Sequence, residues 1–401
     1  MFFQETHIFP SGGEVNYRIP SLVVTNNGTV LAFCTNRVGT LKDYADEIDL
    51  VCAIKRPGED WSEVRVLAHT DGWACNIGSA VYDPEIGRVT VLFKRFPVAI
   101  NEFGNYTPEE LSELKRRREE TIRLAAEQGI IGGLRMLISD DDGAHFREEA
   151  QLLEETPQTH WDGTVHLIGG VTHGGAHGIC LRHGAHKGRL LCPSRVQIGE
   201  YRDWEKLREC VYNNAVYSDD HGKTWKASQC VQVGTGEGTL IERADGSILY
   251  NSRAYFNDGK RYLAVSRDGG ASYGEFAKDD FLLEEKKMGC NASFLRVELE
   301  DISDKACLPR DAADVTVFCN PRAETRTRMA ACVSFDSGAH YVEARVIFDG
   351  PAAYSSLDFD KQSGHFFLLY ERGDAAKGRS PYTEGLYVAE FDLEWLLSHT
   401  V

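Results

Sequence analysis

The sequence predicts an all-β fold built from repeated hairpins. An octet with the pattern Ser-x-Asp-x-Gly-x-x-aromatic begins at Ser139, Ser218, Ser266 and Ser334. Its Asp can accept hydrogen bonds from the backbone of its own turn, and its Gly supplies the positive φ that a tight turn needs. Polar and apolar residues alternate around the octets, which is typical of antiparallel strands joined by tight turns. The octets start 48 to 79 residues apart, a spacing that predicts the blades of a β-propeller with long insertions.

Length and composition agree with this prediction. The chain has 401 residues, with 38 Gly, 19 Phe and 16 Tyr, as expected for many short strands joined by tight turns. A propeller of this length forms one domain, so we expect residues 1–401 to be a single unit.

Charge and cysteine content limit the partners and the compartment. The formal net charge of −17 argues against nucleic acid or an anionic membrane as a partner, and no apolar run approaches the roughly 18 residues of a membrane span. Eleven Cys without metal-type spacing predict mostly reduced, buried thiols and a cytoplasmic location. Residues 1–13 lack the basic and apolar regions of a signal peptide, so a secreted or periplasmic location would require that one had been removed.

The first strands flank two polar features. Residues 17–33 are interpreted as two strands joined by an Asn-Asn-Gly turn, with Arg18 just before an apolar run. On this segment alone, the favoured interpretation of Arg18 is a solvated arginine at the end of a strand. Arg37 and an acidic loop, 42–49, come next, and residues 76–96 predict another hairpin.

One helix is expected within the β fold. Thr107 and Glu110 form a capping box around Pro108, which occupies the first helical position. Apolar residues then recur at helical spacing, so the sequence predicts an inserted helix over 108–127.

Six histidines between residues 160 and 186 raise the alternative of a metal site. Their Gly-rich spacing resembles no HExxH or paired-ligand pattern. We therefore expect strands and turns in this segment, and neither a metal nor another cofactor.

The C-terminal part contains three closely spaced arginines and an isolated tyrosine. Arg322, Arg326 and Arg328 precede the fourth octet, which is more positive charge than a solvated sheet edge requires. Tyr354 lies between small residues, where a packing aromatic is the simpler interpretation. Residues 385–391 predict a last strand that pairs with residues 7–9 and closes a ring, which removes the open sheet edges.

Taken together, these features resemble one known family. Tyr17-Arg18-Ile19-Pro20, the four octets and the arginines at 18, 253 and 326 are similar to the sialidase (exo-α-neuraminidase) family of retaining glycoside hydrolases. The resemblance covers nearly the whole chain. It implies a six-bladed β-propeller with the helix at 108–127 as an insertion.

The resemblance also implies which residues form the site. Tyr354 matches the nucleophile, and Glu237 the glutamate paired with it. Asp43 matches the acid/base aspartate, with Asp46 as the alternative. The residues expected to bind the sugar are the carboxylate-binding triad of Arg18, Arg253 and Arg326, with Arg328 competing for the third place; Glu371, which orients Arg18; and Arg37 and Asn76, near the 4-hydroxyl and 5-substituent.

The chemistry of a sialic acid accounts for these residue types. Its anomeric carbon carries a carboxylate, which planar guanidinium groups bind through paired donors. A carboxylate nucleophile would bring a second negative charge to that carbon, whereas a neutral phenol does not, and sialidases use a Tyr. Free Tyr has a pKa of about 10, so the phenol needs a base beside it.

Two departures widen the expected substrate class. Asn36 and Asn76 stand where many relatives place acidic or other polar residues that contact the sugar. The sequence therefore predicts hydrolysis of terminal sialic acid or of a related 2-keto-3-deoxy sugar acid, such as Kdn or Kdo, from glycans. The alternatives are an inert propeller that binds glycans or proteins, a propeller glycosidase for neutral sugars such as an exo-arabinanase, and transfer in place of hydrolysis. Oligomeric state and linkage preference have no signal in the sequence.

Overall fold

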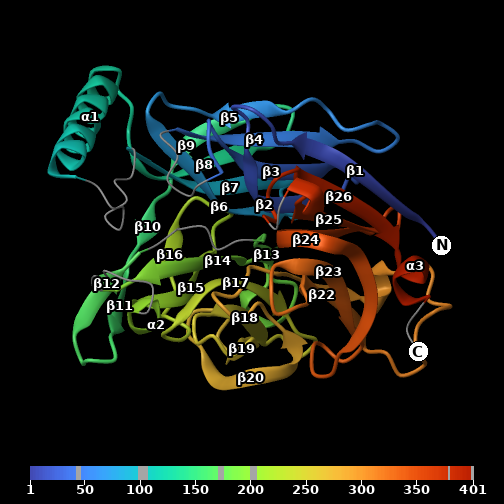
Figure 1. Cartoon of the computed structure of the whole chain (residues 1–401). Coiled ribbons are helices and arrows are strands. Elements are labelled where there is room, and N and C mark those ends of the chain that lie inside the picture. The colour runs from blue at the N-terminus through green and yellow to red at the C-terminus, as the bar shows by residue number, and fades with distance from the viewer. Residues whose placement is uncertain (42–46, 98–106, 170–175, 199–205, 378–379, 399–401) are drawn as a thin grey trace.

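The computed structural model describes residues 1–41, 47–97, 107–169, 176–198, 206–377 and 380–398. Twisted antiparallel sheets make up almost all of the molecule, and helices are few (Figure 1). The predicted all-β fold is therefore confirmed. Among the described residues, no helix combines the length and the apolar composition needed to cross a bilayer.

The N-terminal sheet has the order β2-β3-β4-β6-β7-β8-β9, with β5 paired to β4. Its strands β4 and β6 join through one parallel pair, Ile48 with Ala74, while all other neighbours are antiparallel. The strands are β2 (Tyr17–Val24), β3 (Val30–Arg37), β4 (Ile48–Lys55), β5 (Arg65–Ala68), β6 (Trp73–Asp83), β7 (Arg88–Pro97), β8 (Gly133–Ser139) and β9 (Arg147–Ala150).

The middle of the chain forms two larger sheets and a hairpin. One sheet has the order β10-β16-β15-β14-β13, and the other runs in chain order from β17 to β20. Strands β11 (Thr156–Thr159) and β12 (Val165–Ile168) pair with each other. The remaining strands are β10 (Leu153–Glu154), β13 (Ile179–Cys180), β14 (Leu190–Gln197), β15 (Val211–Ser218), β16 (Trp225–Ala227), β17 (Thr235–Glu242), β18 (Ile248–Ala254), β19 (Lys260–Ser266) and β20 (Gly274–Leu283).

The last sheet joins the two ends of the chain. Its order is β1-β26-β25-β24-β23-β22-β21, and β1 pairs antiparallel with β26, from Phe3 opposite Phe391 to Pro10 opposite Gly385. The predicted pairing of the N-terminal and C-terminal strands is confirmed (Figure 1). The strands are β1 (Phe3–Pro10), β21 (Ser293–Glu298), β22 (Asp314–Pro321), β23 (Thr327–Ser334), β24 (Val342–Asp360), β25 (His365–Arg372) and β26 (Gly385–Asp392).

Each octet forms the predicted turn between two antiparallel strands. At Ser218, the Gly222 N–H donates to Ser218 Oγ over 2.9 Å and the Thr224 N–H to Asp220 Oδ1 over 2.8 Å. The same two bonds recur in the other octets at 2.8–3.0 Å and 2.9 Å. The fourth octet position also has a positive φ, +61° at His221, a feature that the sequence prediction assigned to the glycine alone.

The longest helix is the predicted one. Helix α1 (Pro108–Glu127) begins with the Thr107–Glu110 capping box and projects from the sheets (Figure 1). Ala125 is its buried residue, so α1 adds little to the core. The other helices are α2 (Leu207–Cys210), α3 (Leu393–Leu397) and the 3-10 turns η1 (Gly184–His186), η3 (Leu299–Asp301) and η4 (Ala375–Lys377).

Apolar side chains fill the space between neighbouring sheets. One cluster contains Ile19 of β2, Phe33 of β3 and Phe93 of β7, and it extends to Tyr354 of β24. Eight of the eleven cysteines are buried, in agreement with the expected buried thiols. This packing holds strands from both ends of the chain against one another.

The octet geometry predicts a stability effect at Asp268. Its carboxylate accepts the backbone N–H groups of Ala271 and Ser272 over 3.1 and 2.9 Å, and the hydroxyls of Ser266 and Ser272. We expect Asp268→Ala to lower the free energy of unfolding by about 1–3 kcal/mol, because these donors lose their acceptor. Urea denaturation measures this difference.

Asp280→Ala is the matched control. Asp280 is 90% exposed and pairs with Lys260, so its loss should change the free energy of unfolding by no more than about 0.5 kcal/mol. Equal stability of the two variants would contradict the proposed role of the octet carboxylate.

Candidate active site

A fully buried carboxylate, that of Glu371 on β25, connects two of the predicted site residues. Glu371 accepts Arg18 Nε over 2.8 Å and Arg18 Nη2 over 3.2 Å. It also accepts the backbone N–H groups of Ile19, over 3.0 Å, and of Tyr354, over 3.1 Å. The ion pair with Arg18, expected from the sequence, is present, and the backbone of Tyr354 is held by the same group.

Irregular strands make these contacts possible. The pairing of β2 with β3 shifts register between Arg18 and Ser21, and Ile19 has a φ of +64°, which is unusual for a β-branched residue. The pairing of β24 with β25 shifts between Ala352 and Ser355, on either side of Tyr354. Both bulges turn backbone N–H groups away from the ladder and toward Glu371.

The hydroxyl of Tyr354 belongs to a second buried group. It donates to Glu237 Oε1 over 2.7 Å and accepts Arg253 Nη1 over 2.7 Å, and Arg253 Nη1 also binds Glu237 Oε2. All three residues are buried: Tyr354 is 5% exposed, Glu237 2% and Arg253 4%. The structure therefore brings the predicted nucleophile, its base and the second arginine into direct contact.

Glycines on both sides of Glu237 leave room for two tyrosines that pack against its strand. A Cβ at Gly236 would lie 2.3 Å from Tyr255 Oη, and one at Gly238 would lie 2.3 Å from Tyr250 Cε1. The strand also shifts register between Thr235 and Gly238. The Gly-Glu-Gly sequence thus has a steric cause at the site.

Burial controls the protonation of the tyrosine. Removal from water raises the pKa of Tyr354 well above its usual value; Arg253 opposes this shift and Glu237 adds to it. Burial also acts to lower the pKa of Arg253, but Glu237 and neighbouring groups raise it well above the ordinary value. The resting phenol is therefore protonated, with Glu237 positioned to accept its proton.

The third arginine, Arg326, also lies beside the ring of Tyr354. Its guanidinium carbon is 5.5 Å from the Tyr354 ring centroid, the same distance as that of Arg18. Arg326 donates to the Gly289 carbonyl over 3.0 Å and to the hydroxyl of Tyr382. The competing candidate, Arg328, pairs instead with Glu343 over 2.6 Å.

A turn between β20 and β21 supports two of the arginines, which the sequence did not predict. Arg253 Nε donates to the Met288 carbonyl over 2.7 Å, next to the Gly289 carbonyl that Arg326 uses. The buried ion pair of Arg261 and Glu284 fixes this turn through the backbone of Cys290, with contacts of 2.8 and 3.0 Å. No motif marks this turn, because its contribution comes from backbone carbonyls.

The other predicted residues lie at the edge of this centre or outside the described residues. Asp43 and the alternative Asp46 fall in the segment 42–46, which the structure does not describe. Arg37 ends β3 and is 4% exposed, with Nη1 donating to the Leu41 carbonyl over 3.1 Å. Asn76 lies half-buried on β6, opposite Lys94 of β7, so neither residue joins the contacts around Tyr354 that are described above.

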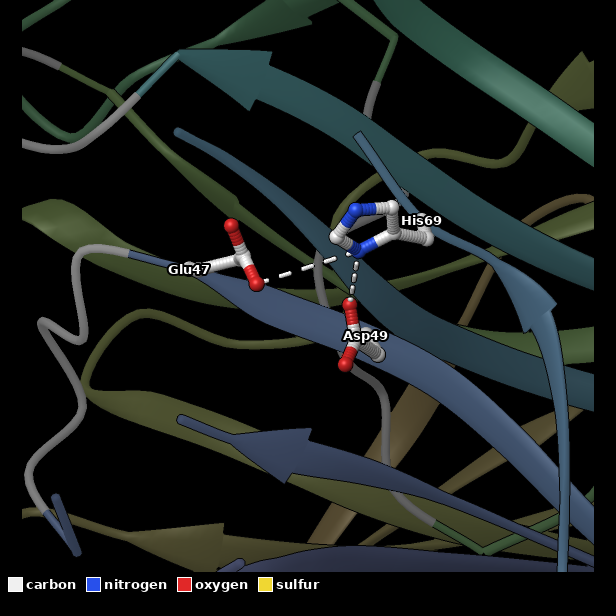
Figure 2. Close-up of side chains that lie close together, drawn as sticks. All are labelled: Glu47, Asp49 and His69. Carbon is white, nitrogen blue, oxygen red and sulfur yellow. Dashed lines mark hydrogen bonds and ion pairs between the residues drawn. The ribbon is translucent and has the colours of Figure 1, made fainter. Parts of the chain in front are cut away.

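Carboxylates lie around His69, and two of them, Glu47 and Asp49, are drawn in Figure 2. His69 Nδ1 lies 2.7 Å from Asp49 Oδ1 and 3.8 Å from Glu47 Oε1, and its Nε2 lies 2.9 Å from Asp71. The hydrogen bond with Asp49 raises the pKa of His69, while partial burial opposes the rise. Asn36, noted in the sequence as a departure, donates to Asp49 over 3.3 Å. When His69 is protonated, these contacts form an ion-pair network.

Comparisons with known proteins agree with this architecture. Residues 38–366 match the family model described as a BNR repeat-like domain. A sialidase from Micromonospora viridifaciens is 29% identical over 385 residues, which is 96% of this chain and 52% of that protein. The chain thus spans about half the length of that curated relative.

Two solved structures show the same fold. The Hadza microbial sialidase Hz136 has a TM-score of 0.68 and 20% identity, with 94% of this chain and 66% of that chain covered. The intramolecular trans-sialidase from Ruminococcus gnavus, in complex with oseltamivir carboxylate, has a TM-score of 0.67 and 15% identity, with 97% and 98% covered. The family model covers most of the sequence, so this chain belongs to the BNR repeat-like domain family, and its predicted resemblance to sialidases is confirmed.

Proposed function

We propose that the protein is a retaining exo-α-sialidase, which hydrolyses terminal sialic acid or a related 2-keto-3-deoxy sugar acid such as Kdn or Kdo. The observation that carries this proposal is the 2.7 Å hydrogen bond from Tyr354 to Glu237, beside Arg18, Arg253 and Arg326. A module that only binds glycans would use the arginines. It would have no use for a buried carboxylate on the phenol.

The arginines would bind the substrate carboxylate. The chain has a formal net charge of −17, so an anionic sugar needs concentrated local positive charge. Glu371 orients Arg18, while backbone carbonyls hold Arg253 and Arg326. Guanidinium groups that are already oriented lose little side-chain entropy when the carboxylate arrives.

Tyr354 would attack the anomeric carbon. As the Oη–carbon bond forms, the phenolic proton passes to Glu237 and the bond to the leaving oxygen breaks. Asp43 would protonate that oxygen and then remove a proton from the water that attacks the tyrosyl glycoside. Tyr354 leaves with the proton returned by Glu237, and the two displacements give net retention.

We also infer that residues 1–401 form one catalytic propeller of six blades. The single parallel pair between β4 and β6 and the change of partner within β24, near residue 351, divide the two largest sheets into smaller antiparallel groups. One strand of each group contacts the next, in the order β2, β6, β14, β17, β21 and β24, and β24 contacts β2. These contacts support a ring of six groups, with the Tyr354 hydroxyl near its centre.

Tyr354→Phe tests the nucleophile. We expect wild type to release 4-methylumbelliferone from an α-ketoside of Neu5Ac, Kdn or Kdo, and the variant to lose at least ~10³-fold in kcat/KM, within the range that catalytic groups contribute. Tyr217→Phe, a buried tyrosine of β15, is the control and should keep the wild-type rate.

Each result of this panel has a distinct meaning. The sugar released by wild type identifies the preferred acid. Wild-type rates in Tyr354→Phe would reject the tyrosine as nucleophile, and release of no sugar together with retained glycan binding would favour the inert propeller.

The assignment of Asp43 has its own test. We expect Asp43→Ala to slow cleavage of natural sialyl oligosaccharides by ~10²- to 10⁴-fold, because their leaving oxygen needs a proton. The loss should be smaller for aryl ketosides, whose phenolic leaving group departs without one. Asp46→Ala is the matched control from the same loop, and the reverse pattern would transfer the acid/base role to Asp46.

A further inference from the structure

We propose that Tyr382 is a fourth residue of the carboxylate subsite, which donates its phenolic hydrogen to the carboxylate of the substrate and shields Arg18 from water. This inference rests on the proposed function. Tyr382 lies between η4 and β26, in a segment without any motif in the sequence, and the sequence prediction did not include it.

The aromatic ring of Tyr382 covers one face of the first arginine. The guanidinium carbon of Arg18 lies 3.6 Å from the Tyr382 ring centroid, and Arg18 is only 4% exposed. A cation and a ring attract each other more strongly when water is excluded. The ring lies against the face of the guanidinium group, while the hydrogen bonds of Arg18 to Glu371 are made from the edge of the group.

The hydroxyl of Tyr382 binds the third arginine. Arg326 Nη1 donates to this oxygen, and because a guanidinium group has no acceptor, the tyrosine must be the acceptor. Its own hydrogen is then directed elsewhere. Within the described part of the chain, that hydrogen has no acceptor.

Tyr382 therefore connects two arginines that lie beside the proposed nucleophile. Arg18 and Arg326 each lie 5.5 Å from the Tyr354 ring centroid, and Tyr382 contacts both of them. A carboxylate bound between these guanidinium groups also meets the phenolic hydrogen of Tyr382. A neutral donor adds a hydrogen bond there without a further positive charge.

The segment around Tyr382 is fixed to the strands that carry the site. The Asp374 N–H donates to Thr383 Oγ1 over 2.9 Å, and the Glu384 N–H donates to the Arg372 carbonyl over 3.1 Å. Arg372 Nε also lies 2.9 Å from Glu384 Oε2. Arg372 directly follows Glu371. The segment that carries Tyr382 is therefore bound to the same strand, β25, that carries Glu371.

Tyr382→Phe separates the hydroxyl from the ring. We expect this variant to bind a 2,3-didehydro sialic acid roughly 10- to 100-fold more weakly than wild type in calorimetry, the scale of one hydrogen bond to a charged group. KM should rise by a similar factor with little change in kcat, because the contact exists before and during the reaction. Tyr382→Ala should lose more, since it also uncovers Arg18.

A carboxamide analogue of the same sugar distinguishes recognition of the carboxylate from a structural effect. The weakening caused by Tyr382→Phe should be large for the acid and small for the amide. Tyr387→Phe, on β26, is the matched control and should bind both ligands as wild type does.

The outcomes separate this inference from the proposed function. Equal or tighter binding of the acid by Tyr382→Phe, with wild type binding normally, would overturn the role of Tyr382 alone. Equal weakening for acid and amide would also overturn it. Failure of wild type to bind the acid would overturn the proposed function and this inference together.

Discussion

The carboxylate of Glu371 accepts four hydrogen bonds in a position with no exposure to solvent. A buried ion is tolerated only when its partners replace the lost hydration, and removal of one partner commonly costs 3–5 kcal/mol. Here the partners are the guanidinium group of Arg18 and the backbone of Ile19 and Tyr354. The bulges in β2 and β24, and with them the positions of the first arginine and the phenol, depend on this one group.

The other two arginines of the site are also held by partners, but these partners differ in charge. Arg253 is held by Glu237 and a backbone carbonyl, whereas Arg326 is held by a carbonyl and a phenol. The positive charge is thus fully balanced around Arg18, and less so around Arg326. Among the described residues no carboxylate pairs with Arg326, so an anion in this site would gain most beside that arginine.

Much of the fold follows from local chemistry that a sequence displays. The Ser, Asp and Gly of each octet, Thr107 and Glu110 at the helix start, and the last strand all form as predicted, because each depends on a few neighbouring residues or on strand patterning. Glu237, Arg253 and Tyr354 also meet as the resemblance implied. These contacts between distant residues have no local signal in the sequence, and only the resemblance to the family predicted them.

Features that depend on distant contacts could not be predicted. The positive φ of Ile19 accompanies the hydrogen bond from its N–H to Glu371, 352 residues away in the chain, and nothing near Ile19 indicates it. The turn at Met288 and Gly289 acts through carbonyl oxygens, which every residue has. Tyr382 lies in the connection between β25 and β26 and meets its arginines through the tertiary fold, so neither its spacing nor its neighbours mark it.

The pairing of β1 with β26 has a consequence for the order of assembly. Arg18 and Glu371 are separated by 353 residues, so a ribosome releases the arginine long before its partner exists. The charged centre therefore forms late, when the C-terminal strands close on the N-terminal ones. A ligand that binds only the form in which this centre is assembled would stabilise that form, and the effect would grow with the logarithm of the ligand concentration above the dissociation constant. Such a ligand would hold the N-terminal and C-terminal strands together through the residues that both contribute to the site.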